Sequence, residues 1–383
     1  MNRPAKRLKY LLVTLLLASL SLHSPARLQA EGEWEITPES EAALRRGLKW
    51  LKENQGPEGN WTSNDLGLVG MGSLAFLSAG HMPGRGPYGK ETERAIDYVV
   101  RNAQPSGLLN ISHQQRDMYN HGLATFVLGQ AYGMTGDRRV GQTLDKALKL
   151  IVQTQCDDGG WDYQAHAQPR GHDLSLAVMQ AKALRSATDS GLEIPPEVIQ
   201  LAIKDVREHY RPQHGDRTTE AAERRGPGTF TYNGGGVTPA MSAAGVVCLQ
   251  EFGQYDDWRI PKNMEFIQAM VKERAEKPPG SRSGAMPFDG YAMYYIGQAV
   301  YQVGGDHWRQ MYPMLRDYLA ASQIHDPDNP ARDGMWQSGG HVGGKPGELY
   351  GTAVACFILA MPNRYLPILQ EGKIERFRQA SEQ

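Results

Sequence analysis

The sequence contains little cysteine. Cys156, Cys248 and Cys356 are the three in 383 residues. None belongs to a Cys-x-x-Cys pair, and none lies at metal-ligand spacing from a histidine. Structural zinc is usually held by pairs of that kind, and disulfide-stapled folds need a larger, paired set of cysteines. We therefore expect small buried thiols, no disulfide framework and no metal site.

The sequence also lacks an apolar run long enough to cross a membrane. Tyr10–Leu22 is apolar apart from small hydroxyl residues, but it is shorter than the about 20 residues that a transmembrane helix needs. Basic residues such as Arg3 and Lys6 precede it, and Leu28-Gln29-Ala30 resembles a cleavage site. This pattern predicts a signal peptide over residues 1–30, with an uncleaved anchor as the alternative. The mature chain, residues 31–383, is then exported to a periplasm, an envelope compartment or the medium, with no transmembrane span.

An excess of basic residues is missing as well. Of the 41 Lys and Arg residues, five precede Glu31, whereas all 42 Asp and Glu residues lie at or after it, so that the mature chain carries a net charge of −6. Proteins that bind nucleic acid or anionic membranes usually present a basic surface. The charge therefore argues against both classes of partner.

No nucleotide-binding loop is present. The glycine-rich strings Tyr232–Gly236 and Ser338–Gly344 lack the Gly-Lys-Ser/Thr sequence of a P-loop, and no strand leads from either into a helix. We therefore expect no cofactor.

The most informative feature that is present is a repeated segment. A helical stretch ending in Gln is followed by a short gap and Gly-x-Trp, and the three clearest copies are Arg46–Trp61, Lys146–Trp161 and Tyr318–Trp336. A period of roughly fifty residues indicates stacked structural units rather than one irregular core.

Each unit pairs an amphipathic helix with a helix that is apolar nearly all round. A helix of the second kind is buried on every side, and an open solenoid would leave its end units uncapped. The pattern therefore predicts one all-α domain over residues 31–383, an α6/α6 toroid in which small residues on the inner helices leave a central cavity. The predicted pairs are 44–55 with 66–77, 94–104 with 119–132, 146–155 with 173–184, 198–210 with 238–252, 264–273 with 292–303 and 314–323 with 349–360.

The repeated segment resembles the QW repeat of squalene and oxidosqualene cyclases, whose toroid is shared by the β subunits of protein prenyltransferases. The match is close in the first two copies, good in Tyr318–Trp336, and degraded around Gln104, where Leu replaces Trp. The resemblance covers nearly the whole mature chain and implies the toroid fold. It also implies a structural role for the repeated Gln and Trp residues, because a Gln amide can bond the backbone groups left free at helix ends.

The family's catalytic motifs are not found. The chain has no Asp-x-Asp-Asp acid of the cyclases, no Asp-x-Cys of the prenyltransferase zinc site, and no Cys-Gly-Glu-Gln thioester of the complement-type toroids. We therefore predict a repeat protein that binds a hydrophobic, isoprenoid-like small molecule or a peptide in its central cavity. A cyclase- or transferase-type enzyme with a rebuilt site is one alternative. A carbohydrate-active α6/α6 enzyme that uses Asp173 and Glu348 is another.

Polar residues recur where the inner helices are predicted to begin. Asp173 and Glu348 fall in the third and sixth units, which face each other in a ring of six, so they are candidates for a general acid/base pair. Alternatively, both acids cap helices. His121 is a candidate base, or a structural histidine. The predicted ligand-binding residues, whose aromatic members alternatively belong to the core, are Asp65, Tyr119, His172, Tyr291, Tyr294 and Tyr350.

Overall fold

A computed structural model describes residues 34–61, 63–212, 219–276, 283–338 and 347–370. The chain divides into two compact units, Met1–Pro38 and Glu39–Gln383. In the first unit, residues 34–38 are described, and they form a turn that leads into a helix. The predicted signal peptide lies outside the described residues. Among those that are described, no helix is long and apolar enough to span a membrane.

Six amphipathic helices form the outer layer of the second unit. Each buries its apolar face and exposes charged residues, as α5 does by burying Ile96 and Val99. Several begin earlier than predicted, and α14 starts at Gly305 rather than Met314. The buried Trp308 and Met311 of α14 have helical spacing, but Pro313 follows them inside the helix, and a proline normally ends a helical pattern. The outer helices are α3 (Pro38–Glu53), α5 (Gly89–Arg101), α7 (Arg138–Gln153), α9 (Pro196–Glu208), α12 (Arg259–Ala275) and α14 (Gly305–Ser322).

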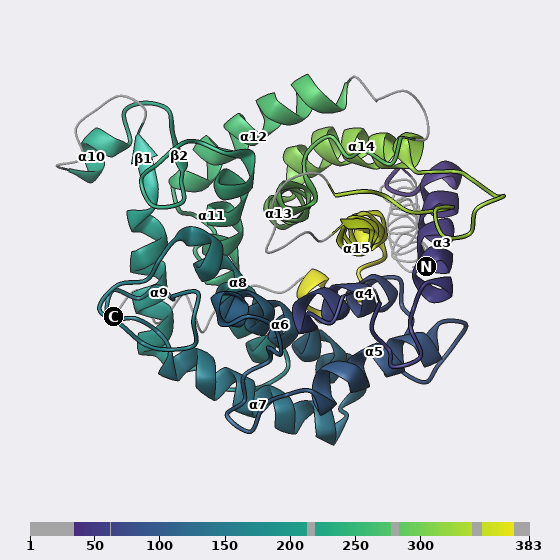
Figure 1. Cartoon of the computed structure of the whole chain (residues 1–383). Helices are drawn as coiled ribbons and strands as arrows, with labels where there is room; N and C mark the ends of the chain where they lie inside the picture. Colours follow the sequence, from purple (N-terminus) through teal and green to yellow (C-terminus); the bar gives the residue numbers. More distant parts are fainter. Residues whose placement is uncertain (1–33, 62, 213–218, 277–282, 339–346, 371–383) are drawn as a thin grey trace, which may run out of the picture. The chain divides into compact units, whose positions relative to one another are not determined.

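Six apolar helices form the inner layer. Each contacts the next one along the chain, and α15 contacts α4, so the layer closes into a ring (Figure 1). Small residues allow close contact: a β-carbon on Gly122 of α6 would come within 2.7 Å of the Met179 side chain on α8. The predicted α6/α6 toroid is confirmed. The inner helices are α4 (Leu66–Ser78), α6 (Asp117–Thr135), α8 (Leu174–Asp189), α11 (Pro239–Glu251), α13 (Gly290–Val303) and α15 (Gly347–Ala360).

The repeated glutamines join neighbouring outer helices. The Gln55 side-chain amide donates to the Gly59 carbonyl in its own loop at 3.1 Å and to the Glu91 carbonyl in α5 at 2.9 Å. Gln155 and Gln323 make the corresponding pair of bonds. In each of these three repeats the tryptophan indole donates to a backbone carbonyl of the preceding outer helix; these residues are Trp61, Trp161 and Trp336.

The loops between outer and inner helices turn at glycines in the left-handed region. Gly59 and Gly159 have φ values of 97° and 102°. A β-carbon on either would collide with the backbone of the next outer helix, at Arg94 and at Leu201. Glycine is therefore required twice over, by its φ and by the close approach of a neighbouring helix.

A small excursion follows α9, in a segment that the sequence pattern leaves without structure. Strand β1 (Tyr210–Pro212) pairs antiparallel with β2 (Gly228–Phe230), with Tyr210 opposite Phe230, and the helix α10 (Glu220–Glu223) lies between them in the chain. Figure 1 shows this excursion at the outside of the ring.

Large side chains of the inner helices extend into the middle of the ring. The Tyr295 hydroxyl of α13 lies 3.2 Å from the sulfur of Met179 on α8. The Lys182 ammonium, also on α8, lies 4.4 Å from the Phe126 ring centroid and 5.9 Å from that of Tyr294. Because α8 and α13 are not neighbours in the ring, the contacts of α8 with Tyr294 and Tyr295 reach past α11, whereas Phe126 belongs to the neighbouring α6. The small residues of the inner helices bring the helices together, and the large aromatic side chains fill the space between them.

Candidate functional site

Asp173 lies at the amino end of α8 and accepts four hydrogen bonds. Its Oδ1 accepts from the backbone N–H of Ser175 at 2.9 Å and from the Ser175 hydroxyl. Its Oδ2 accepts from the Tyr163 hydroxyl at 2.7 Å and from His172 Nδ1 at 3.1 Å. A carboxylate has about four lone-pair sites. Asp173 is therefore the helix cap and also the centre of a group of hydroxyl and imidazole side chains.

Tyr119 extends this cluster from α6. Its hydroxyl bonds the Ser175 hydroxyl, which itself donates to Asp173, so Tyr119 is the donor in the shared bond. The Tyr163 ring lies 5.6 Å from the Tyr119 ring and 4.3 Å from the His172 ring. Burial, and then the negative charge of Asp173, raise the pKa of Tyr119. Tyr119 therefore stays protonated and acts as a hydrogen-bond donor. We name Tyr119, Tyr163, His172, Asp173 and Ser175 the Asp173 cluster.

Glu348 occupies a different environment from Asp173. It lies in the first turn of α15 and is exposed, whereas Asp173 is 7% exposed. Their helices are the third and sixth of the inner ring, on opposite sides as predicted. Within the described ranges, no hydrogen bond or ion pair joins the two carboxylates to each other.

Two further predicted residues have partners outside the Asp173 cluster. Asp65 precedes α4 and forms an ion pair with Arg116 at 2.6 Å. His121 is fully buried in α6, where Nδ1 accepts from the Leu109 N–H at 3.1 Å and Nε2 lies 3.0 Å from the Ala147 carbonyl. Burial lowers the pKa of His121 to about 4. His121 is therefore neutral and holds a loop and α7 in place through both ring nitrogens.

Among the described residues, the buried tyrosine hydroxyls without a hydrogen-bond partner include those of Tyr291, Tyr294 and Tyr350. Their rings form a connected group through Tyr295, with centroids 4.9 Å apart for Tyr291 and Tyr295 and 6.5 Å apart for Tyr294 and Tyr350. Burial raises the pKa of each of the three hydroxyls. They are protonated donors that have no acceptor among the described residues. After burial, the neighbouring Tyr295 is the largest further cause of the raised pKa of Tyr291.

The sequence pattern missed two features of the inner layer, one at each end of the ring. Tyr163 lies in the loop before α8, where nothing in the periodicity distinguishes it. The second is the ion pair between Lys182 and Glu251, at 3.1 Å with both side chains 1% exposed. A charge within an otherwise apolar inner helix is the signal that could have revealed this pair.

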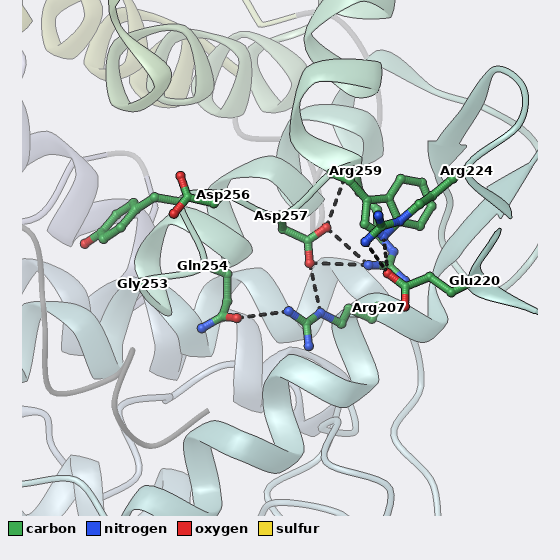
Figure 2. A pocket seen from close by; sticks show the side chains of 10 residues that line it. Arg207, Glu220, Arg224, Gly253, Gln254, Asp256, Asp257 and Arg259 are labelled. Carbon is green, nitrogen blue, oxygen red and sulfur yellow. Dashed lines mark hydrogen bonds and ion pairs between the residues drawn. The ribbon is translucent and has the colours of Figure 1, made fainter. Parts of the chain in front are cut away.

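A separate pocket of about 410 Å³ lies under the excursion, at the start of α12 (Figure 2). Asp257 accepts from Arg207 Nε at 2.9 Å and from an Arg259 guanidinium nitrogen at 3.2 Å. Glu220 of α10 accepts from the Trp258 indole at 2.8 Å. These charged groups pair with one another, so this pocket holds α10 against the ring.

Metal-binding geometry is not found in the part of the chain that the structure describes, where no three His, Cys, Asp or Glu side chains gather. The three cysteines are buried and unpaired.

No protein family and no curated protein matches the chain. Similar solved structures include an inactive variant of the α-1,6-mannanase GH76A of Salegentibacter sp. HEL1_6 in complex with α-1,6-mannotriose. It has a TM-score of 0.52 and 10% identity, over 88% of this chain and 100% of that chain. The complex of another inactive variant with α-1,6-mannotetrose has a TM-score of 0.52 and 10% identity, over 87% of this chain and 100% of that chain.

This chain is an α/α toroid. A type II terpene cyclase from Scytonema, in complex with geranylgeranyl dihydroxybenzoate, gives a TM-score of 0.49 and 12% identity over 86% of this chain and 98% of that chain. The toroid fold that the repeat resemblance implied is therefore confirmed by the mannanase structures. Identities this low show the fold and leave the activity of this chain open.

Proposed function

We propose that this protein binds a hydrophobic small molecule with an oxygen-bearing head group at the amino end of its inner helices, and does not convert it. The observation that carries the proposal is the set of three buried hydroxyls, on Tyr291, Tyr294 and Tyr350, that have no acceptor. A buried polar group without a partner costs about 1–3 kcal/mol. An oxygen atom of a ligand would supply the missing acceptor.

The ligand class follows from the side chains around these hydroxyls. The aromatic faces favour an apolar body, whereas the phenols, whose raised pKa values keep them protonated, favour oxygen acceptors over cations. Isoprenoid alcohols and acids combine both features. The Asp173 cluster supports the site by fixing Tyr119 through Ser175.

Binding without turnover is favoured because the candidate catalytic groups are already engaged. Asp173 accepts four hydrogen bonds, so it would have to lose a donor before it took a proton. His121 has both ring nitrogens bonded to backbone groups. The acid pair of the carbohydrate alternative would need Asp173 to exchange a proton with substrate in spite of these bonds, so we favour it least.

An enzymatic role is the second candidate, and one contact favours it. Asp173 accepts from His172 Nδ1, which leaves Nε2 as the basic nitrogen of a ring whose side chain is 48% exposed. A carboxylate that fixes an imidazole in this tautomer is a common arrangement for a general base. His172 would then take a proton from a hydroxyl or water beside Tyr163.

The binding proposal can be tested with two ligands that share a carbon skeleton, one with and one without a hydroxyl group. We expect farnesol to bind the purified protein in calorimetry and to bind more tightly than farnesane, the saturated hydrocarbon of the same skeleton. Tyr350→Phe and Tyr291→Phe should each weaken farnesol binding about fivefold, the effect of one hydrogen bond. Tyr365→Phe, at an exposed ring, is the matched control.

Equal affinities for farnesol and farnesane, or unchanged farnesol affinity in both inner variants, would contradict the proposal. If the ligand is instead a peptide, the other class that the sequence predicts, a peptide will bind and farnesol will not. Turnover of a bound alcohol that is lost in His172→Asn would establish the enzymatic role instead.

A further inference from the structure

The opposite end of the ring contains a second cavity, of about 610 Å³, where the inner helices α11 and α13 end. Its wall includes Gln250 and Glu251 from α11 and Gln302 from α13. Ile260, at the start of α12, and Leu369, near the end of the described chain, supply apolar surface. None of these residues belongs to the Asp173 cluster or the tyrosine group.

Two buried oxygen atoms in this wall lack donors. Glu251 is fully buried, and its Oε1 accepts from Lys182 Nζ at 3.1 Å and from Gln302 Nε2 at 2.7 Å. Its other oxygen, Oε2, has no hydrogen-bond partner, and neither has Oε1 of Gln302. Buried acceptors of this kind are rare in native proteins, and each calls for a donor.

The charges around Glu251 indicate what kind of donor fits. Lys182 already balances the Glu251 carboxylate, and Asp189 pairs with Arg185 at 2.9 Å. A second ammonium would be repelled by Lys182. A neutral hydroxyl group donates a hydrogen bond without adding charge, so it suits Oε2 of Glu251 and Oε1 of Gln302 together.

We propose that this cavity binds a neutral, hydroxyl-rich small molecule of about monosaccharide size, which donates hydrogen bonds to Glu251 and Gln302. The site is independent of the tyrosine group and of the ligand proposed there. Its volume lies within the range of pockets that enclose small ligands. The contrast with the pocket of Figure 2 supports the proposal, because there Asp257 and Glu220 receive donors from the protein itself.

Three sugars that share the glucose ring differ in the hydrogen-bond donors that they carry. Glucose carries neutral hydroxyl donors, permethylated glucose keeps the oxygens but has no donor, and glucosamine carries an ammonium group. We expect saturable binding of glucose to the full chain in saturation-transfer NMR, no binding of permethylated glucose, and weaker binding of glucosamine.

Two variants test the residues named. Gln302→Met removes one acceptor and also the Gln302 donor to Oε1 of Glu251, but it leaves the ion pair of Lys182 with Glu251 in place. We expect it to weaken glucose binding about fivefold or more. Glu251→Gln should weaken it further, but it leaves Lys182 unpaired, so its fold must first be checked by circular dichroism. Gln254→Met, at a glutamine that accepts from Arg207 in the pocket of Figure 2, is the matched control.

The proposal is overturned if glucose gives no saturable signal, or if permethylated glucose binds equally well. It is also overturned if Gln302→Met binds glucose like the control variant. Tighter binding of glucosamine would show that the cavity selects a cation, contrary to the charge argument. None of these outcomes depends on whether farnesol binds at the tyrosine group, so the two proposals fail separately.

Discussion

Asp173 and Glu251 are carboxylates of similar burial at opposite ends of inner helices, yet their surroundings differ. Asp173 caps the amino end of α8 and has four donors within hydrogen-bonding reach. Glu251 lies at the carboxyl end of α11, shares one oxygen between Lys182 and Gln302, and keeps the other without a donor. Both oxygens of the carboxylate have hydrogen-bond donors at one end of the ring, whereas one oxygen lacks a donor at the other end.

The difference follows from the helix ends themselves. The amino end of a helix offers free backbone N–H groups, one of which Asp173 accepts. The carboxyl end offers carbonyl oxygens, so an acid there must find its donors on side chains. A carboxylate whose oxygens all have protein donors holds its neighbours in place, whereas one that lacks a donor can accept a hydrogen bond from a ligand.

The largest expected effect comes from breaking the ion pair at the carboxyl end. Lys182→Met should destabilise the protein by about 3–5 kcal/mol, because it leaves a buried Glu251 charge unpaired. Urea unfolding measures the change. The double variant Lys182→Met with Glu251→Met should recover most of that loss, since it removes both charges. A single variant that costs under about 1 kcal/mol would contradict the importance given to this ion pair.

The next effect is a pH dependence that originates at His121. Its pKa is about 4 in the folded protein, against an ordinary value of 6.5, so the folded state binds fewer protons between these pH values. The stability that His121 contributes is complete above pH 6.5 and falls by up to about 3 kcal/mol as the pH drops towards 4.

Asp189 changes the stability of the folded protein with pH in the opposite direction to His121. Burial raises its pKa from 3.8 to about 6, so the folded state gains stability as the pH falls through 6. Unfolding of the wild type and of His121→Gln at several pH values separates the two groups. The free energy of unfolding of His121→Gln should no longer fall on acidification through the pH range between 6.5 and 4. Identical pH profiles of this free energy in the variant and the wild type would contradict the assignment to His121.

A smaller effect is expected at the amino end. Asp173→Ala should cost about 2 kcal/mol, because it removes a helix cap and leaves donors from Tyr163 and Ser175 without an acceptor. Asp173→Asn keeps an oxygen for the cap and should cost less. Thermal unfolding of the two variants is the measurement. Equal losses in both would show that the charge, rather than the cap, is what Asp173 contributes.

The smallest effect compares two tyrosines. Tyr163→Phe removes a hydrogen bond to a charged group and should cost about 1–2 kcal/mol. Tyr350→Phe removes a hydroxyl that has no partner, so it should leave stability unchanged or raise it by up to about 1 kcal/mol. If Tyr350→Phe destabilises as much as Tyr163→Phe, the Tyr350 hydroxyl has an acceptor and the binding proposal loses its main support.

The ring could be predicted from the sequence because its information is repeated. Each inner helix is apolar on all sides, and each loop with Gly-x-Trp follows a Gln, so that an error in one unit is corrected by the others. The structure shows the physical reason: Gln55 and Gln155 each bond one outer helix to the next. Where a unit departs from the pattern, as in the excursion that contains α10, the sequence did not predict the local secondary structure.

The candidate site could be predicted only in part, because its contacts join residues that no pattern relates. The inner-helix periodicity placed Asp173 and Tyr119 near each other, and the structure joins them through Ser175. Tyr163 reaches Asp173 from a loop, and Lys182 meets Glu251 from another helix. Helix periodicity does not reveal how far the side chains of Tyr294 and Tyr295 reach into the ring, so the predicted central cavity stays a prediction.

The bond from Gln323 to the Ala43 carbonyl has a consequence for how the chain is threaded. It links the last outer helix to the first with the same geometry that links consecutive repeats. The seam that closes the ring is therefore equivalent to the seams that Gln55 and Gln155 form. It also means that α3 cannot gain its final neighbour until almost all of the chain has been synthesised, so ring closure is a late, long-range step of folding.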